Sequence, residues 1–170
     1  MINTNKKIQY FLYQYTPAIL LYTSILSEID FNNSEFKYFS FNFAYILIFY
    51  YSLKRESGIG YIYIFIAGLF NDVVNGLPMG ISSLCYLLLC AAAVYLRNIT
   101  LRPNIFKDWI FFLITISFLN CINFSFLILF FSYEINYFDQ ITNITFTFLL
   151  YLFFSYLFKI YDDIILSRIN

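Results

Sequence analysis

The chain has 170 residues, of which 61% are hydrophobic and 12% are charged, and its formal net charge is zero. Soluble domains typically carry about 25% charged residues, so this composition excludes an ordinary soluble domain and indicates a membrane protein. The chain contains no histidine. Since histidine is the commonest metal ligand and general base, this argues against chemistry built on that residue.

Long apolar runs follow one another along the chain, and each is a candidate transmembrane helix. A helix needs about 20 residues to cross ~30 Å of hydrocarbon, so six helices would leave only short loops. We therefore expect an all-α membrane protein that forms one domain over residues 1–170. The runs are approximately Ile8–Ser27, Phe39–Leu53, Ile59–Val74, Ile81–Leu96, Trp109–Ser132 and Ile141–Ile160.

The basic residues are concentrated in every second gap between the apolar runs. Short loops rich in Lys and Arg stay on the cytoplasmic side, so this sorting predicts six transmembrane helices with both termini in the cytoplasm. One set of gaps and chain ends holds Lys6, Lys7, Lys54, Arg55, Arg97, Arg102, Lys107, Lys159 and Arg168. The other gaps hold Glu28, Asp30, Glu35, Glu134 and Asp139, with Lys37 as their cation.

The first run resembles a secretory signal because two lysines precede it. It is about 20 residues long, however, whereas the apolar part of a signal peptide has roughly 7–15 residues. No cleavage pattern of small residues follows it. We expect a retained helix that is kinked at Pro17, where a backbone donor is missing.

The cysteines Cys85, Cys90 and Cys121 all fall inside predicted helices and show no metal-binding spacing. We interpret them as small packing residues and not as disulfide partners. Together with the alanines at 91–93, Cys85 and Cys90 would allow a neighbouring helix to approach closely.

Charged and aromatic residues flank the predicted helices. Trp109, which follows Lys107 and Asp108, suits the aromatic belt at the level of the lipid headgroups. We interpret Asp108 and the pair Asp162-Asp163 as solvated helix flanks and not as catalytic carboxylates.

Polar residues lie at membrane depth in the last two runs. Three of them, Ser117, Asn120 and Asn123, recur every third residue and so share a helix face. They could form a polar path for a substrate, or they could make hydrogen bonds between helices, worth about 0.6–2 kcal/mol each. We favour bonds between helices because no ionisable group lies among these residues. The full set is Thr115, Ser117, Asn120, Asn123, Thr142, Asn143, Thr145 and Thr147.

Residues 58–80 depart from this pattern because they contain all five glycines of the chain and Asp72, the one acidic residue inside a predicted helix. A carboxylate near the bilayer centre costs ~2.5–3.5 kcal/mol on insertion scales, so it needs a reason. Asn75-Gly76 is a turn dipeptide, and Pro78 cannot continue the preceding helix.

The third and fourth runs should therefore form a helical hairpin. Asp72 can accept hydrogen bonds from free backbone N–H groups at the start of the fourth run, where the helix dipole also favours negative charge. The alternative is that Asp72 pairs with a cation on a partner or a substrate.

This hairpin sequence resembles the signature of the rod shape-determining protein MreD family. The family signature has a glycine four residues before an aspartate, then a glycine, a small or proline position, and a glycine that opens the next helix. The basic loop Lys54-Arg55 and the Tyr-Leu-Arg-Asn element at 95–98 are also similar. The chain departs from the family in having no proline at the start of the second run and Tyr50-Tyr51 in place of a Tyr-Trp pair. The matching residues are Gly68, Asp72, Gly76, Pro78 and Gly80, and Asn75 lies among them.

The resemblance implies a non-enzymatic subunit of the bacterial elongation machinery in the inner membrane, with no catalytic residue, metal or cofactor. Its implied partners are an MreC-like bitopic protein, an MreB-like actin homologue, and a RodA-type glycosyltransferase with its class B penicillin-binding protein. No nucleic acid is implied. The family is also similar in fold to the six-helix S components of vitamin transporters, so the alternative is a small-molecule-binding subunit of a transporter.

Overall fold

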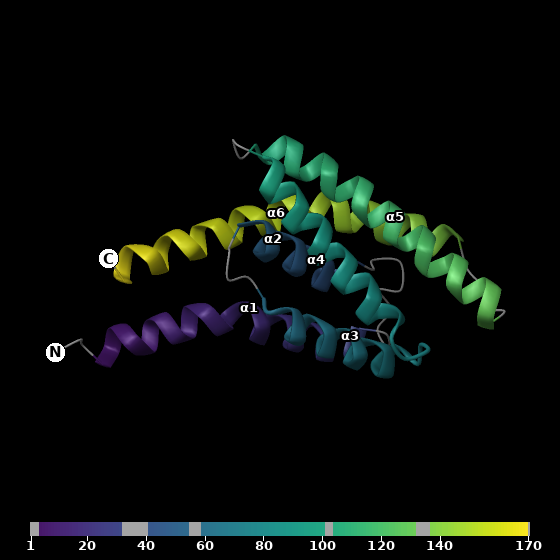
Figure 1. Cartoon of the computed structure of the whole chain (residues 1–170), viewed down its shortest axis with the longest axis horizontal. Coiled ribbons are helices and arrows are strands. Elements are labelled where there is room, and N and C mark those ends of the chain that lie inside the picture. Colours follow the sequence, from purple (N-terminus) through teal and green to yellow (C-terminus); the bar gives the residue numbers. More distant parts are fainter. Residues whose placement is uncertain (1–3, 32–40, 55–58, 101–103, 132–136, 170) are drawn as a thin grey trace.

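The computed structural model describes residues 4–31, 41–54, 59–100, 104–131 and 137–169. Within these ranges the chain is helical, and the expected all-α architecture is confirmed. The N-terminal end of α1 and the C-terminal end of α6 lie at the same end of the molecule (Figure 1). The helices are α1 (Thr4–Phe31), α2 (Phe43–Lys54), α3 (Tyr61–Asn75), α4 (Ile81–Ile99), α5 (Ile105–Phe131) and α6 (Tyr137–Ile169).

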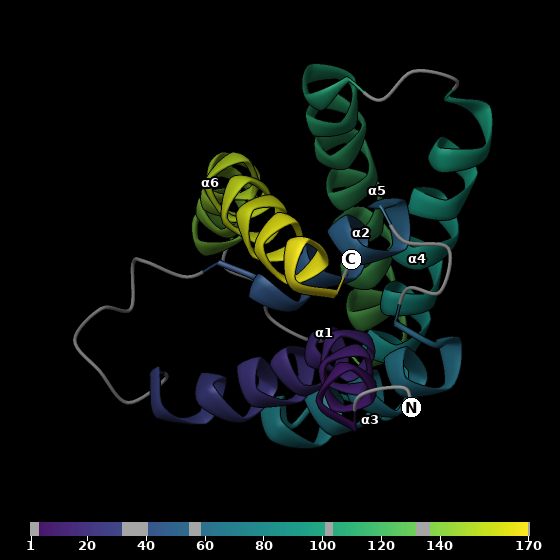
Figure 2. The same cartoon turned by 90° about the vertical axis from the view of Figure 1, so that its left-hand side faces the viewer.

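The helix α2 is the centre of the fold. Every residue from Ala44 to Leu53 is buried, and in Figure 2 the other helices lie around α2. A helix that is hydrophobic on all sides can lie in a protein core or in a membrane, and here it is the packing of the other helices that buries it. At 12 residues, α2 is only ~18 Å long, well short of the ~30 Å hydrocarbon layer.

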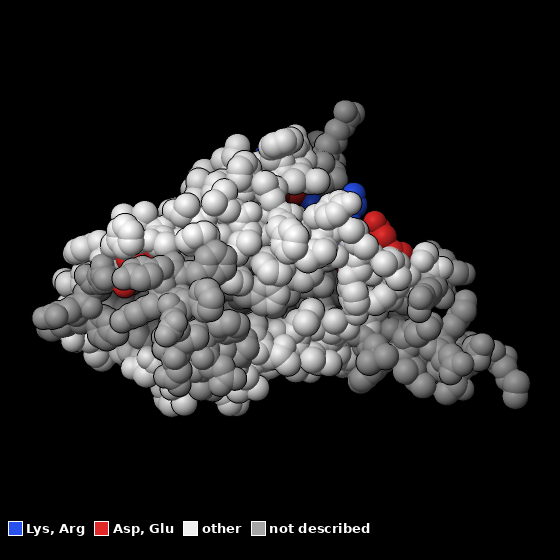
Figure 3. Space-filling view, turned by 180° about the vertical axis from the view of Figure 1, so that it is seen from behind, with Lys and Arg blue, Asp and Glu red and all other residues white. Residues whose placement is uncertain are grey.

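The helices differ in length and in apolar character. Three segments of the described chain are long and apolar enough to cross a membrane: Ile81–Ile99, Ile105–Phe131 and Tyr137–Ile165. The apolar helices α2 and α3 are shorter, at 12 and 15 residues. On the face seen in Figure 3, charged side chains are few among the described residues. The molecule is therefore of the membrane-protein type.

Aromatic side chains fill the space between α2, α5 and α6. The ring of Phe49 lies 4.9 Å from that of Phe112 and 5.7 Å from that of Tyr151, and the rings of Phe112 and Tyr151 stack at 4.4 Å. Such pairs stabilise a core beyond the burial of their area. The high phenylalanine and tyrosine content thus contributes to the internal packing.

Several helices extend beyond the apolar runs that predicted them. The helix α1 is continuous through Pro17, and Figure 2 shows α1 changing direction along its length. The helix α5 begins at Ile105 and so includes Lys107 and Asp108. The helix α6 continues to Ile169. Of the charges used to predict the topology, Glu35, Lys37, Arg55, Arg102 and Glu134 lie outside the described residues.

Of the polar residues in α5 and α6, Thr147 makes a hydrogen bond to another segment as predicted, because its Oγ1 accepts from Asn42 N before α2. For four others the prediction is wrong, because they bond within their own helix. Asn120 Nδ2 donates to the carbonyl of Ile116, one turn earlier in its own helix. The hydroxyls of Thr115, Thr142, Thr145 and Thr147 bond in the same way to the residue four positions earlier. This local bond needs no partner helix, which explains why these residues are tolerated at membrane depth.

Packing gives two other residue types a role within the bundle. Cys85 and Cys90 are buried as expected, whereas Cys121 is exposed and is not a packing residue. Trp109 stacks on Phe148 of α6 at 4.3 Å, and its Nε1 donates to the Phe148 carbonyl at 2.9 Å. The indole therefore joins α5 to α6.

Candidate functional site

The candidate site is the turn between α3 and α4, and Asp72 is its centre. The Asp72 side chain, in the last turn of α3, is fully buried. Its Oδ2 accepts a hydrogen bond from Gly80 N at 2.7 Å, and its Oδ1 accepts one from Ser82 N at 2.9 Å. These N–H groups belong to the start of α4, where a helix has no internal acceptors for them. The hydrogen bonds predicted for Asp72 are therefore present.

The end of α3 is closed by a glycine in the left-handed region. Gly76 has φ +63°, and its N–H donates to the Val73 carbonyl at 3.4 Å. Leu77 N donates to the carbonyl of Asp72 at 2.9 Å. This pair of bonds is the Schellman arrangement that ends a helix. Asp72 thus binds the turn through its backbone oxygen and the next helix through its carboxylate.

The two helices approach most closely at Gly68. A Cβ built on Gly68 would lie 2.3 Å from Ser83 Cα, so no side chain fits there. Ser83 Oγ donates to the carbonyl of Phe65 at 3.1 Å, across the same contact. The glycine at position 68 therefore determines the spacing between α3 and α4.

An amide and a hydroxyl complete this polar network. Asn71 Nδ2 donates to Ser82 Oγ at 3.0 Å in a buried position. Asn75 Nδ2 donates to the backbone carbonyl and to the side-chain oxygen of Asn71, at 3.1 and 3.2 Å. Sequence reasoning named Asn75 but gave no role to Ser82 or Ser83. The sequence feature that could have identified these two serines is their adjacent position at the start of an apolar helix.

Five of the six candidate residues of the sequence analysis lie in the end of α3 and the turn that follows it, and Gly68 lies one helical turn before Asp72, at the contact with α4. Gly68, Asp72 and Gly76 make the contacts described above, and Gly80 supplies a donor at φ +103°. The Pro78 carbonyl accepts a bond from Ile81 N at 3.5 Å. The site is therefore an internally bonded junction between two helices.

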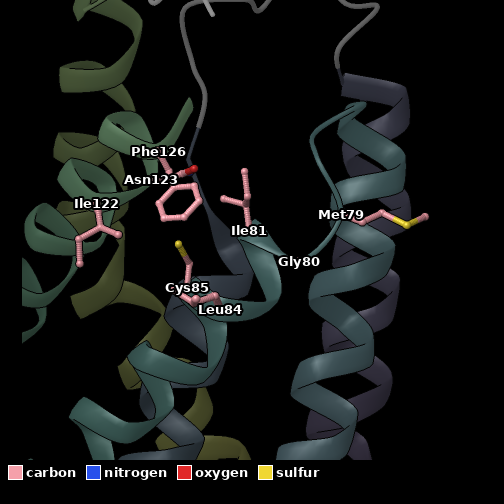
Figure 4. Close-up of a pocket in the computed structure, with 8 residues that line it drawn as sticks. All are labelled: Met79, Gly80, Ile81, Leu84, Cys85, Ile122, Asn123 and Phe126. Atoms are coloured by element: carbon pink, nitrogen blue, oxygen red, sulfur yellow. The ribbon is translucent and has the colours of Figure 1, made fainter. Parts of the chain in front are cut away.

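A recess of about 270 Å³ adjoins this turn. Its walls come from the start of α4 and the second half of α5, and Asp72 does not line it. Figure 4 shows Ile81, Cys85 and Phe126 converging on the recess while Met79 points away from it. Apart from Asn123 the lining is apolar. The lining residues are Met79, Gly80, Ile81, Leu84, Cys85, Ile122, Asn123 and Phe126.

A second polar cluster involves Asp108, which the sequence analysis interpreted as a solvated flank. That interpretation is wrong. Asp108 Oδ2 lies 2.8 Å from Lys54 Nζ, and the Asp108 side chain is only 4% exposed, against 32% for Lys54. Because α5 begins at Ile105, Asp108 lies in its first turn and faces the bundle.

No protein-family model, no curated protein and no solved structure matches this chain.

Proposed function

We propose that this chain is an MreD-like, non-enzymatic subunit of the cell-shape machinery in the bacterial inner membrane. In this role it crosses the membrane six times, keeps both termini in the cytoplasm, and scaffolds an MreC-like protein, an MreB-like filament and the RodA-type peptidoglycan synthase pair.

The observation that supports this proposal is that the Asp72 carboxylate is fully engaged in hydrogen bonds within the chain. Both of its oxygens accept backbone N–H groups of α4, so the buried charge is already compensated within the chain. A carboxylate bonded in this way stabilises a helix junction and does not need a substrate cation. The motif residues that resemble the MreD signature thus have structural roles, as expected of a scaffold.

The arrangement of the helices agrees with the proposed topology. The start of α1 and the end of α6 lie at one end of the bundle (Figure 1), as an even number of crossings requires. Lys54 and Arg97 lie at the ends of α2 and α4, and we place these ends at the cytoplasmic face.

A second candidate is a small-molecule-binding subunit that is similar to a transporter S component. The recess beside Gly80 favours it, since its volume of about 270 Å³ suits a small apolar group. We rank it second because the only side-chain amide at its wall is that of Asn123, and specific recognition needs several converging polar groups.

Purification from native membranes in a mild detergent tests the two candidates together. We expect the chain to co-purify with a bitopic MreC-like protein, and its depletion to turn rod-shaped cells into spheres. Mass spectrometry of the same sample detects any bound small molecule. Recovery as a lone subunit that carries a stoichiometric metabolite, under conditions that preserve related complexes, would overturn the scaffold assignment in favour of the transporter.

A further inference from the structure

The buried helix α2 poses a problem for membrane insertion. It is only 12 residues long, and Lys54 is its last residue. In hydrocarbon every backbone polar group needs a partner, and the first and last turns of a helix have none of their own. A helix of 12 residues is too short to bring both of its ends to the membrane surfaces, so at least one end of α2 must find its partners inside the protein.

The N-terminal end of α2 finds one partner locally and one from α6. Asn42 Oδ1 accepts a hydrogen bond from Tyr45 N at 3.1 Å, which is a helix cap made by the preceding residue. The backbone N–H of Asn42 donates to Thr147 Oγ1 at 2.9 Å. Thr147 lies 105 residues further along the chain.

The C-terminal end of α2 is held by α4 and α5. Arg97 Nη1 donates to the Ser52 carbonyl at 3.2 Å, in the last described turn of α2. Lys54 forms its ion pair with Asp108. Helix dipoles stabilise the charges in both contacts. Lys54 and Arg97 lie at the C-terminal ends of α2 and α4, where positive charge is favoured, and Asp108 lies in the first turn of α5, where negative charge is favoured.

All three partners from outside α2 are synthesised after it. We infer that α2 is a conditional membrane segment, which takes its place in the bundle only when Arg97, Asp108 and Thr147 have bonded to its two ends. The inference rests on the membrane placement proposed above and does not depend on the cell-shape role.

A pair of neighbouring residues in α2 and α4 allows the position of α2 to be measured by disulfide formation. Ser52 Oγ lies 3.2 Å from Cys90 Sγ of α4, so Ser52→Cys should form a disulfide with Cys90 on mild oxidation when α2 is in place. The full-length chain carries this change together with Cys85→Ala and Cys121→Ala. A protease site inserted after residue 57 then makes the link visible, because the two fragments stay joined on a non-reducing gel.

A second reporter follows the α3–α4 hairpin independently of α2. Asn71→Cys with Ser82→Cys uses the side-chain contact of 3.0 Å, in a chain whose native cysteines are all alanine. The turn is left intact, and the 71–82 link is detected by mass spectrometry of the digested, unreduced protein. A loss of the 52–90 link alone indicates release of α2, whereas a loss of both links indicates general unfolding.

We expect Asp108→Leu to lower the ratio of linked to unlinked 52–90 chains at least about tenfold, because Lys54 then lacks its buried partner. Adding Lys54→Leu to this variant should restore most of the link, since no unpaired charge remains. The matched control Asp163→Leu, at an exposed position of α6, should link like the parent. The 71–82 link should persist in all of these chains.

Three results would overturn the inference. Asp108→Leu could link 52–90 as well as the parent does. The 71–82 link could be lost together with the 52–90 link, which would assign the ion pair to the whole bundle. The variant with both leucines could remain as poorly linked as Asp108→Leu. The position of α2 would then require the Asp108 side chain itself and not its ion pair with Lys54. None of these measurements depends on cell shape or on co-purification.

Discussion

The Cα of Gly68 and the backbone of Ser83 lie in direct contact across α3 and α4, at a separation that leaves no room for a Cβ. Small residues at such crossings allow helices to pack closely in membranes, where van der Waals contact is a main source of association. This contact and the Asp72 hydrogen bonds connect the same two helices at successive turns of α3.

Gly68→Ala should destabilise the protein by about 1–3 kcal/mol, because the added methyl forces the two backbones apart. The measurement is thermal unfolding in detergent. The matched control is Gly60→Ala, where the added Cβ meets only the ring of Tyr63, at 3.2 Å. Equal melting temperatures for the two variants would contradict the role assigned to position 68.

Asp72→Asn should be milder than Asp72→Leu in its effect on stability, since asparagine keeps one oxygen acceptor for the start of α4. Hydrogen bonds to a charged group contribute ~1.5–3 kcal/mol each, and leucine loses both. Thermal unfolding and protein abundance in the membrane provide the comparison. Equal loss of function in both variants at normal abundance would instead show that the charge itself is needed.

Gly76→Ala should cost about 1–2 kcal/mol because alanine resists the left-handed conformation. No atom lies within 4 Å of a Cβ built at Gly76, so the cost comes from the backbone alone. Gly76→Asn should be milder, since asparagine tolerates this region. A lower unfolding temperature for Gly76→Asn than for Gly76→Ala would argue against the Schellman turn.

A cysteine that replaces Leu77, in a chain without native cysteines, should react with a membrane-impermeant thiol reagent added to intact cells. Leu77 lies in the turn that we place on the outer face. Asn98→Cys, at an exposed position in the last turn of α4, is the control and should react only after the membrane is opened. Protection of position 77 in intact cells would favour a hairpin that enters and leaves on the cytoplasmic side.

The sequence was sufficient to predict the six helices and the α3–α4 turn, because these features depend on local properties. Apolar runs, glycines and the spacing of Asp72 from Gly80 act over a few residues. The burial of Asp108 could not be predicted in this way. Its apolar run begins at Trp109, one residue later, and only the packing of α5 against the end of α2 shows that the helix starts earlier and faces inward.

The central position of α2 could not be predicted from the sequence either. Its sequence is as apolar as that of a lipid-facing segment, so composition cannot distinguish a core helix from a peripheral one. Likewise, a threonine such as Thr145 can bond to its own helix or to a neighbour, and only the position of the neighbour decides between them. Sequence patterns report chemistry along one helix, whereas these outcomes depend on how helices are placed around each other.

The indole of Trp109 gives this protein a built-in optical probe. Trp109 is the only tryptophan of the chain, and it is stacked on Phe148 with its N–H engaged by a carbonyl of the adjoining helix. Separation of α5 from α6 would change the surroundings of this one fluorophore and of no other. Intrinsic emission from the unmodified protein therefore follows the docking of its last two helices without any added label.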